Sequence, residues 1–170
     1  MFFNFLKLNN SENGFTLIEI ILAIFILGLA LLASFVLIQQ SIIGASLNQS
    51  QLTAYYLCQE GVEIVRNIRD TEWLGSGAGI ASGTWEADYL SSSLESLSGE
   101  PRLLKVDENG FYSYADGGSE SKFKRQIVIT SDTDSDFDGY LEVDVVVTWK
   151  ERGQDHQAEV VNRLYDWYNL

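Results

Sequence analysis

Gly14-Phe15-Thr16-Leu17-Ile18-Glu19 opens an apolar run that continues to Ile38 and carries one charge, on Glu19. At about 1.5 Å of helix rise per residue, the 24 residues from 15 to 38 are long enough to cross the roughly 30 Å hydrocarbon layer of a membrane. We therefore expect residues 15–38 to form a transmembrane helix. A carboxylate within such a span costs roughly 2.5–3.5 kcal/mol on insertion scales, so Glu19 needs a partner, and no residue of the run can supply one.

The segment before this run predicts proteolytic processing. Residues 1–14 form a short polar leader whose only charges are on Lys7 and Glu12. A secretory signal peptide would have an apolar core of about 7–15 residues, followed by a small residue. Here the apolar core is longer and the small residue, Gly14, precedes it. The sequence therefore argues against an ordinary signal peptide.

These residues resemble the type IV prepilin and pseudopilin family, whose signature is a short leader, Gly-Phe-Thr-Leu-Ile-Glu and an apolar helix. The resemblance is specific from Gly14 to Leu32 and only architectural afterwards. It implies that prepilin peptidase cleaves between Gly14 and Phe15 on the cytoplasmic side and N-methylates Phe15. It also implies that Glu19 pairs with the terminal amine of a neighbouring subunit in the filament, which is the partner that this carboxylate needs. A plain single-pass anchor, with Glu19 near the lipid headgroups, is the alternative.

After the span, an amphipathic pattern predicts that the same helix continues over residues 39–70. Apolar or small residues recur at i, i+3, i+4 and i+7 spacing, which places them on one helical face that must be covered: Ala54, Leu57, Cys58, Gly61, Ile64, Val65 and Ile68. We interpret Cys58 as a packed small residue and not as a reactive thiol. Because it is the sole cysteine, no intramolecular disulfide can form.

Residues 71–100 are rich in Gly and Ser and are expected to form a long connecting loop, held to the head by scattered aromatic and aliphatic side chains. Residues 101–170 are expected to form a β-sheet head. The strands predicted there, separated by turn signals, are 102–106, 110–114, 123–130, 140–150 and 159–167. The predicted fold class is α+β: a long helical spine packed against an antiparallel meander of four or five strands, the lollipop shape that the resemblance implies.

The loop between two predicted strands, residues 131–142, is dense in oxygen ligands. Starting at Asp134, it follows the first nine positions of an EF-hand loop, with these candidate metal ligands: Asp134, Asp136, Asp138, Tyr140 and Glu142. The twelfth position is Val145, where an EF-hand has Glu, and the flanking segments are predicted strands and not helices. A structural calcium ion is one interpretation, and a solvated acidic hairpin loop is the other.

Charge and motif content limit the function classes. The net charge of −13 argues against direct binding of nucleic acid, which requires clustered Lys and Arg. Lys122, Lys124 and Arg125 do cluster, and we interpret them as a solvent-exposed strand face. The single histidine, His156, is placed in a surface turn, and the sequence lacks a phosphate-loop motif, Cys-x-x-Cys zinc spacing and a recognisable triad. We therefore expect neither enzymatic activity nor a required cofactor.

The sequence predicts a structural subunit of a type IV pilus, or of a type II secretion or competence pseudopilus, and more specifically a minor or accessory one. The precursor would lie in the cytoplasmic membrane with its head outside the cytoplasm and would later enter a surface or periplasm-spanning helical filament. The partners that the resemblance implies are prepilin peptidase, other pilin subunits, an assembly platform protein and an ATPase. The alternative is an unprocessed, membrane-anchored surface protein whose head binds calcium or another ligand.

Overall fold

The computed structural model describes residues 14–75, 79–132 and 140–165. These residues form one long helix, α1, and an antiparallel sheet in which seven strands are described. The predicted α+β fold class is confirmed. The chain divides into two compact units, Met1–Ala45 and Ser46–Leu170.

The first unit holds the apolar part of α1, which begins at Leu17. The helix extends as far as Gly75 in the second unit, five residues beyond the predicted end. Within the described part of the first unit, the large apolar side chains from Phe15 to Ile42 are exposed on every side of the helix, with exposed fractions of 50–79%. No other segment described in this unit covers them, because it contains no further helix or strand.

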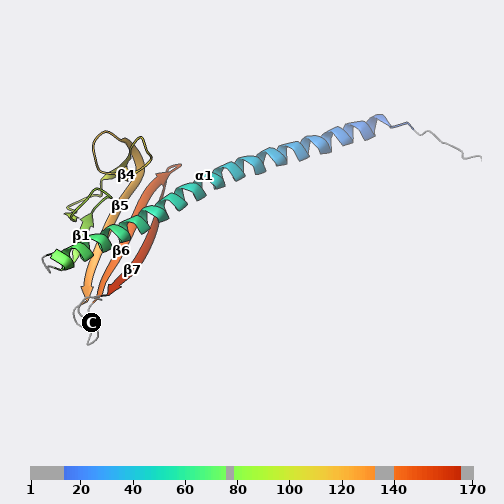
Figure 1. The fold of residues 1–170 in the computed structure, drawn as a ribbon. Coiled ribbons are helices and arrows are strands. Elements are labelled where there is room, and N and C mark those ends of the chain that lie inside the picture. The colour runs from blue at the N-terminus through green and yellow to red at the C-terminus, as the bar shows by residue number, and fades with distance from the viewer. Residues whose placement is uncertain (1–13, 76–78, 133–139, 166–170) are drawn as a thin grey trace, which may run out of the picture. The chain divides into compact units, whose positions relative to one another are not determined.

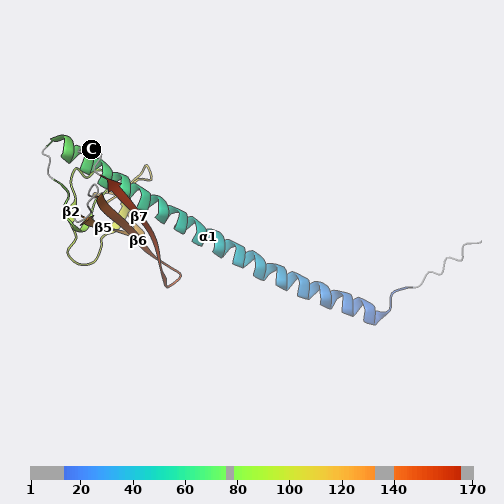
Figure 2. The same ribbon diagram turned by 90° about the horizontal axis from the view of Figure 1, so that it is seen from below.

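In the second unit, one stripe of α1 lies against the sheet, and Figures 1 and 2 show the helix running along one face of the strands. Six residues of the predicted stripe are buried: Ala54, Leu57, Cys58, Gly61, Val65 and Ile68. Ser50, Val62 and Arg69, which were not predicted for the stripe, are buried as well. Ile64 is only partly buried at the edge of this core. Cys58 is a free cysteine with no exposed surface, which confirms its interpretation as a packing residue.

The sheet is organised around β5. Its strands are β1 (Gly83–Glu86), β2 (Glu95–Ser96), β3 (Leu103–Val106), β4 (Tyr112–Ser113), β5 (Ser119–Asp132), β6 (Tyr140–Glu151) and β7 (Gln154–Tyr165). The last three form the predicted meander, with Phe123 opposite Trp149 and Trp149 opposite His156. Along the other edge of β5, β1 pairs with residues 127–129 and β3 with residues 119–124. β1 and β3 therefore pair with successive parts of the same edge of the 14-residue strand β5.

Two features of this sheet differ from the sequence-based expectation. The segment 71–100, expected to be a loop, contains β1 and β2, and β2 pairs with β1 before the chain continues to β3. The head is also not a simple meander, since β1 and β3 both pair with β5. Gly- and Ser-rich composition hid these short strands, because β1 is held by pairing with β5 and β2 by pairing with β1, and neither has an alternating apolar pattern of its own.

The interpretation of Arg125 as part of an exposed strand face was wrong. Strand side chains alternate between faces, so Arg125 shares the inner face with Phe123 and Ile127. On the other face, Lys122 is exposed and Lys124 is half-buried. Arg125 has no exposed surface. Its guanidinium donates to the carbonyl oxygens of Leu57 on α1, at 3.1 Å, and of Ala87, at 2.5 Å. It therefore links the sheet to the helix and to the segment after β1.

His156 also differs from expectation, since it lies in β7 and not in a turn. Its ring stacks on Trp149 with centroids 5.4 Å apart and is half-buried there. The turn between β6 and β7 occurs earlier, at Arg152 and Gly153, which have φ values of 54° and 82°. This turn lies between the predicted strands 140–150 and 159–167, but the second of them begins sooner than the predicted residue 159.

Candidate functional site

The bond between Gly14 and Phe15 lies just before the first turn of α1. Residues 14–16 are neither helical nor paired in a strand, and both Gly14 and Phe15 are exposed, Phe15 by 79%. A Cβ placed on Gly14 would meet nothing within 4 Å. A peptide bond in regular secondary structure has to unfold before a protease can bind it, whereas this one is available without unfolding the helix.

Thr16 and Glu19 form the start of the helix. The Thr16 hydroxyl accepts a hydrogen bond from the Glu19 backbone N–H at 3.3 Å, and the Thr16 carbonyl accepts from the N–H groups of Glu19 and Ile20 at 3.1 and 3.3 Å. Thr16 is therefore the N-cap, and Glu19 is the third helical residue. The spacing is that of a Thr-x-x-Glu capping box, of which the Thr16 half is formed. The first-turn position also favours a negative charge through the helix dipole.

This capping role was not recognised from the sequence, although the Thr-x-x-Glu spacing was present to reveal it. The cap at Thr16 fixes the start of the helix at Leu17, three residues after Gly14. The Glu19 side chain is exposed, and within the described residues no hydrogen bond or ion pair of its carboxylate is found. The helix start therefore presents a carboxylate beside the residues at which cleavage is predicted.

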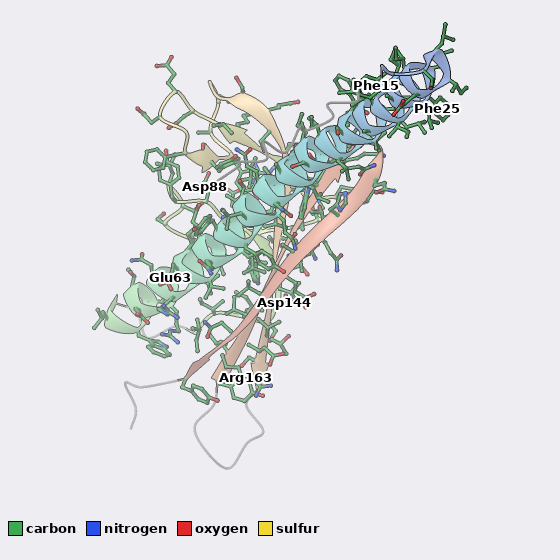
Figure 3. All side chains as sticks on the ribbon, turned by 90° about the vertical axis from the view of Figure 1, so that its right-hand side faces the viewer. Phe15, Phe25, Glu63, Asp88, Asp144 and Arg163 are labelled. Atoms are coloured by element: carbon green, nitrogen blue, oxygen red, sulfur yellow. The ribbon has the colours of Figure 1, made fainter. Side chains whose placement is uncertain are left out.

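The helix that follows is suited to an apolar environment. By length and composition it can cross a membrane, and its apolar side chains project outward all round, as Figure 3 shows near Phe15 and Phe25. An apolar surface of this extent is unfavourable in water, at roughly 25 cal/mol per Å². Lipid or other polypeptide chains must cover it.

The predicted metal ligands fall partly outside the described residues. Asp134, Asp136 and Asp138 are not described, whereas Tyr140 and Glu142 lie at the start of β6. Glu142 Oε2 accepts a hydrogen bond from Arg163 Nε at 2.9 Å, and the Arg163 guanidinium lies 5.0 Å from the centroid of the Tyr140 ring. No metal-binding group of three or more ligands occurs among the described residues. Calcium binding therefore stays a prediction.

The buried thiol of Cys58 is not poised for chemistry. Its Sγ lies 3.5 Å from the Ala158 carbonyl oxygen, and burial raises its pKa to about 11. A thiol with such a pKa is almost entirely protonated at neutral pH, and the thiolate is the reactive form. Cys58 serves the packing of helix on sheet.

Comparison with known families decides the nature of the N-terminal segment: residues 9–35 match the model of the prokaryotic N-terminal methylation motif. The chain carries a type IV prepilin-like signal. This signal includes Gly14, Phe15 and Glu19, together with the cap at Thr16. No curated protein and no solved structure matched the chain.

The prepilin-like signal supports a pilin-like protein that is processed by prepilin peptidase, and the family with this motif is structural and not catalytic. The signal and the apolar helix together indicate a membrane-anchored protein. The match ends at residue 35, so it covers the N-terminal signal and the first part of the apolar helix, and not the head.

Proposed function

We propose that this chain is a structural subunit of a type IV pilus or of a related secretion or competence pseudopilus, in the class of minor subunits. The observation that carries the proposal is one arrangement: an exposed, non-helical Gly14–Phe15 bond next to a capped helix whose apolar side chains no described segment covers. Such a helix needs apolar partners both before and after the leader is removed. Lipid covers the helix in the precursor, and the helices of neighbouring subunits cover it in the filament.

Cleavage after Gly14 creates a new amine at Phe15, four residues before Glu19. Since the helix begins at Leu17, this amine and the Glu19 carboxylate lie at the same end of one chain, at nearly the same depth in the apolar layer. In a filament, the amine of one copy can neutralise the carboxylate of the next, because both charges are desolvated and each is costly alone. Methylation leaves the amine basic. The pairing would fix the axial register between subunits.

The remaining partners follow from the proposed assembly. Prepilin peptidase would process the precursor in the cytoplasmic membrane, with the head outside the cytoplasm. A platform protein and an ATPase would move the processed subunit from lipid into the filament. No catalysis by this chain is required, and its head would be displayed on the filament surface.

A direct test is processing in membranes. The full chain is expressed in membranes with an active prepilin peptidase and, in parallel, with an inactivated peptidase. We expect intact mass to show loss of residues 1–14 and addition of one methyl group only with the active enzyme. Gly14→Val, which adds a branched side chain at the cleaved bond, should block the loss, whereas Gly28→Ala, where a Cβ meets nothing within 4 Å, should be processed normally.

An uncut chain in the presence of an active peptidase would contradict the proposal. It would favour the alternative of a permanently anchored surface protein, for which the same exposed helix serves only as a membrane span.

A further inference from the structure

An exposed aromatic cluster lies on two loops of the head. Tyr89 and Leu90 follow β1, and Phe111 precedes β4; their exposed fractions are 45%, 60% and 58%. The rings of Tyr89 and Phe111 pack on each other with centroids 5.6 Å apart and planes inclined at 46°. Large apolar side chains gathered on loops, rather than covered by the fold, are typical of binding surfaces.

The first loop is held rigidly by a buried carboxylate. Asp88, which is 5% exposed, accepts hydrogen bonds from the Leu90 N–H at 3.0 Å, the Ser91 hydroxyl at 2.9 Å and the Tyr114 N–H at 2.7 Å. Its own N–H donates to the Ser91 hydroxyl at 2.9 Å. Figure 3 labels Asp88 on the part of the head that contains these loops, away from Asp144 and Arg163.

The second loop is fixed in the same manner by Asp107. Its carboxylate accepts from the N–H groups of Asn109 and Phe111 at 2.8 and 2.9 Å, and its own N–H donates to the Phe111 carbonyl at 3.0 Å. Both aromatic rings therefore stand on loops whose backbones are already ordered. Binding to such a surface loses little conformational entropy.

A polar hollow of about 380 Å³ adjoins this cluster, since Asp88 and Leu90, on either side of Tyr89, both line it. This volume is within the range of small-ligand sites, about 300–1,000 Å³. The side chains that bring hydroxyl or charged groups to it include Ser92, Ser93, Glu95 and Arg102. The hollow thus offers both donors and acceptors of hydrogen bonds beside an aromatic surface.

The charges of the hollow argue against an ionic ligand. Arg102 Nε donates to Glu86 Oε2 at 2.6 Å, and Arg102 Nη2 donates to Glu95 Oε2 at 2.7 Å. An anion would meet Glu95 and Asp88, and a cation would meet Arg102. A neutral molecule rich in hydroxyl groups would meet no such repulsion, because each hydroxyl can both donate and accept.

We propose that the Tyr89–Phe111 cluster and the adjoining hollow form a binding site for a neutral oligosaccharide. The apolar C–H face of one sugar ring lies on the exposed aromatic rings, which offer rigid contact area at low entropic cost. The hydroxyl groups of the same or the next sugar reach Ser92, Ser93, Glu95 and Arg102. This inference goes beyond the proposed filament function, because it concerns what the displayed head binds.

The test uses the full chain in lipid nanodiscs on an array of neutral and charged glycans, followed by titration of the best neutral glycan in solution. We expect at least one neutral glycan to bind. Tyr89→Ala and Phe111→Ala should each weaken its binding roughly tenfold or more, equal to about 1.4 kcal/mol. Tyr56→Ala removes an aromatic ring of 61% exposure from α1 and is the matched control, with unchanged affinity.

Because all three rings are on the surface, the variants should keep the unfolding temperature of the parent, which is measured alongside. If no neutral glycan binds, or if binding is unchanged in both Tyr89→Ala and Phe111→Ala, the proposed glycan site is refuted. Loss of self-association in the same variants without glycan binding would instead identify a contact between copies and would also overturn it. None of these results bears on cleavage at Gly14, so the two proposals fail separately.

Discussion

At Gly61, α1 packs closely against the sheet. A Cβ at this position would be 2.9 Å from Val145 Cγ1 and 3.3 Å from Arg125 Cδ. Both neighbours are completely buried, so neither can move easily. The missing side chain at Gly61 gives room for the stem of Arg125, whose guanidinium reaches the carbonyl of Leu57 one turn earlier on the helix.

We predict that Gly61→Ala destabilises the head, even though alanine favours a helix over glycine by about 1 kcal/mol. Overpacking of a tight core costs about 1–3 kcal/mol, and here it also displaces a buried guanidinium. Denaturant unfolding of the full chain in detergent would measure the loss. Gly44→Ala is the control: a Cβ there meets nothing within 4 Å, so its unfolding free energy should be unchanged or higher. An equal or greater stability of the Gly61 variant would refute this packing account.

Single residues also show the limits of sequence reasoning. The N-terminal motif was readable because the order of glycine, aromatic and acid is rare and local. Arg125 was misassigned, although period-two alternation already placed it with Phe123 and Ile127. Its burial depends on two carbonyl partners that are 68 and 38 residues away in sequence, and no local pattern reports such partners.

At the scale of elements, a polar network ties the β6–β7 turn and β5 to the first turns of α1 in the second unit. Glu151 accepts from the Ser46 hydroxyl at 2.8 Å and from Lys122 Nζ at 2.9 Å. Lys122 Nζ also donates to the Ser50 hydroxyl at 2.6 Å. The Ser50 hydroxyl, the Lys122 ammonium and the Ser46 hydroxyl together lower the pKa of Glu151 from 4.5 to about 2.

A carboxyl group with a pKa lower in the folded than in the unfolded chain stabilises the fold above its unfolded pKa. This contribution should therefore be complete above about pH 4.5 and should disappear as the pH falls toward 2. Glu151→Gln removes it, so we predict a lower unfolding midpoint for the variant at neutral pH and convergence with the parent near pH 2.

The measurement is thermal unfolding across this pH range, with Asp155→Asn as control. Asp155 is 87% exposed and lies 3.9 Å from Lys150, so its removal should change the midpoint little at any pH. A pH-independent difference between the Glu151 variant and the parent would contradict the electrostatic explanation.

The elements that the sequence predicted well are those with strong periodicity. The 3.6-residue stripe of α1 and the alternation in β6 each have their own pattern of burial, and both elements appear within a few residues of expectation. The two-residue strand β2 has no such pattern and both its residues are exposed. β2 exists because it pairs with β1, which is itself held on the edge of β5, so its formation is a tertiary effect.

At the scale of the molecule, the two units have opposite requirements. The first unit exposes apolar side chains, and Glu19 is the one charged residue among its described residues. The second unit contains the buried core and almost all of the net charge of −13. A highly charged unit is stable in water, whereas the apolar helix is stable only in lipid or among other chains. This division follows directly from the sequence, because composition changes abruptly after Ile43.

The central claim, that the chain is a processed filament subunit, is tested most directly by N-terminal analysis of surface filaments sheared from the source cells, for the parent and for Glu19→Gln. We predict filaments that contain the chain beginning at N-methylated Phe15. We also predict a Glu19 variant that is cleaved but absent from, or strongly depleted in, the filaments, because glutamine keeps the size of the side chain and removes its charge. A chain that still begins at Met1 and remains in the membrane, or a Glu19 variant incorporated like the parent, would contradict the account.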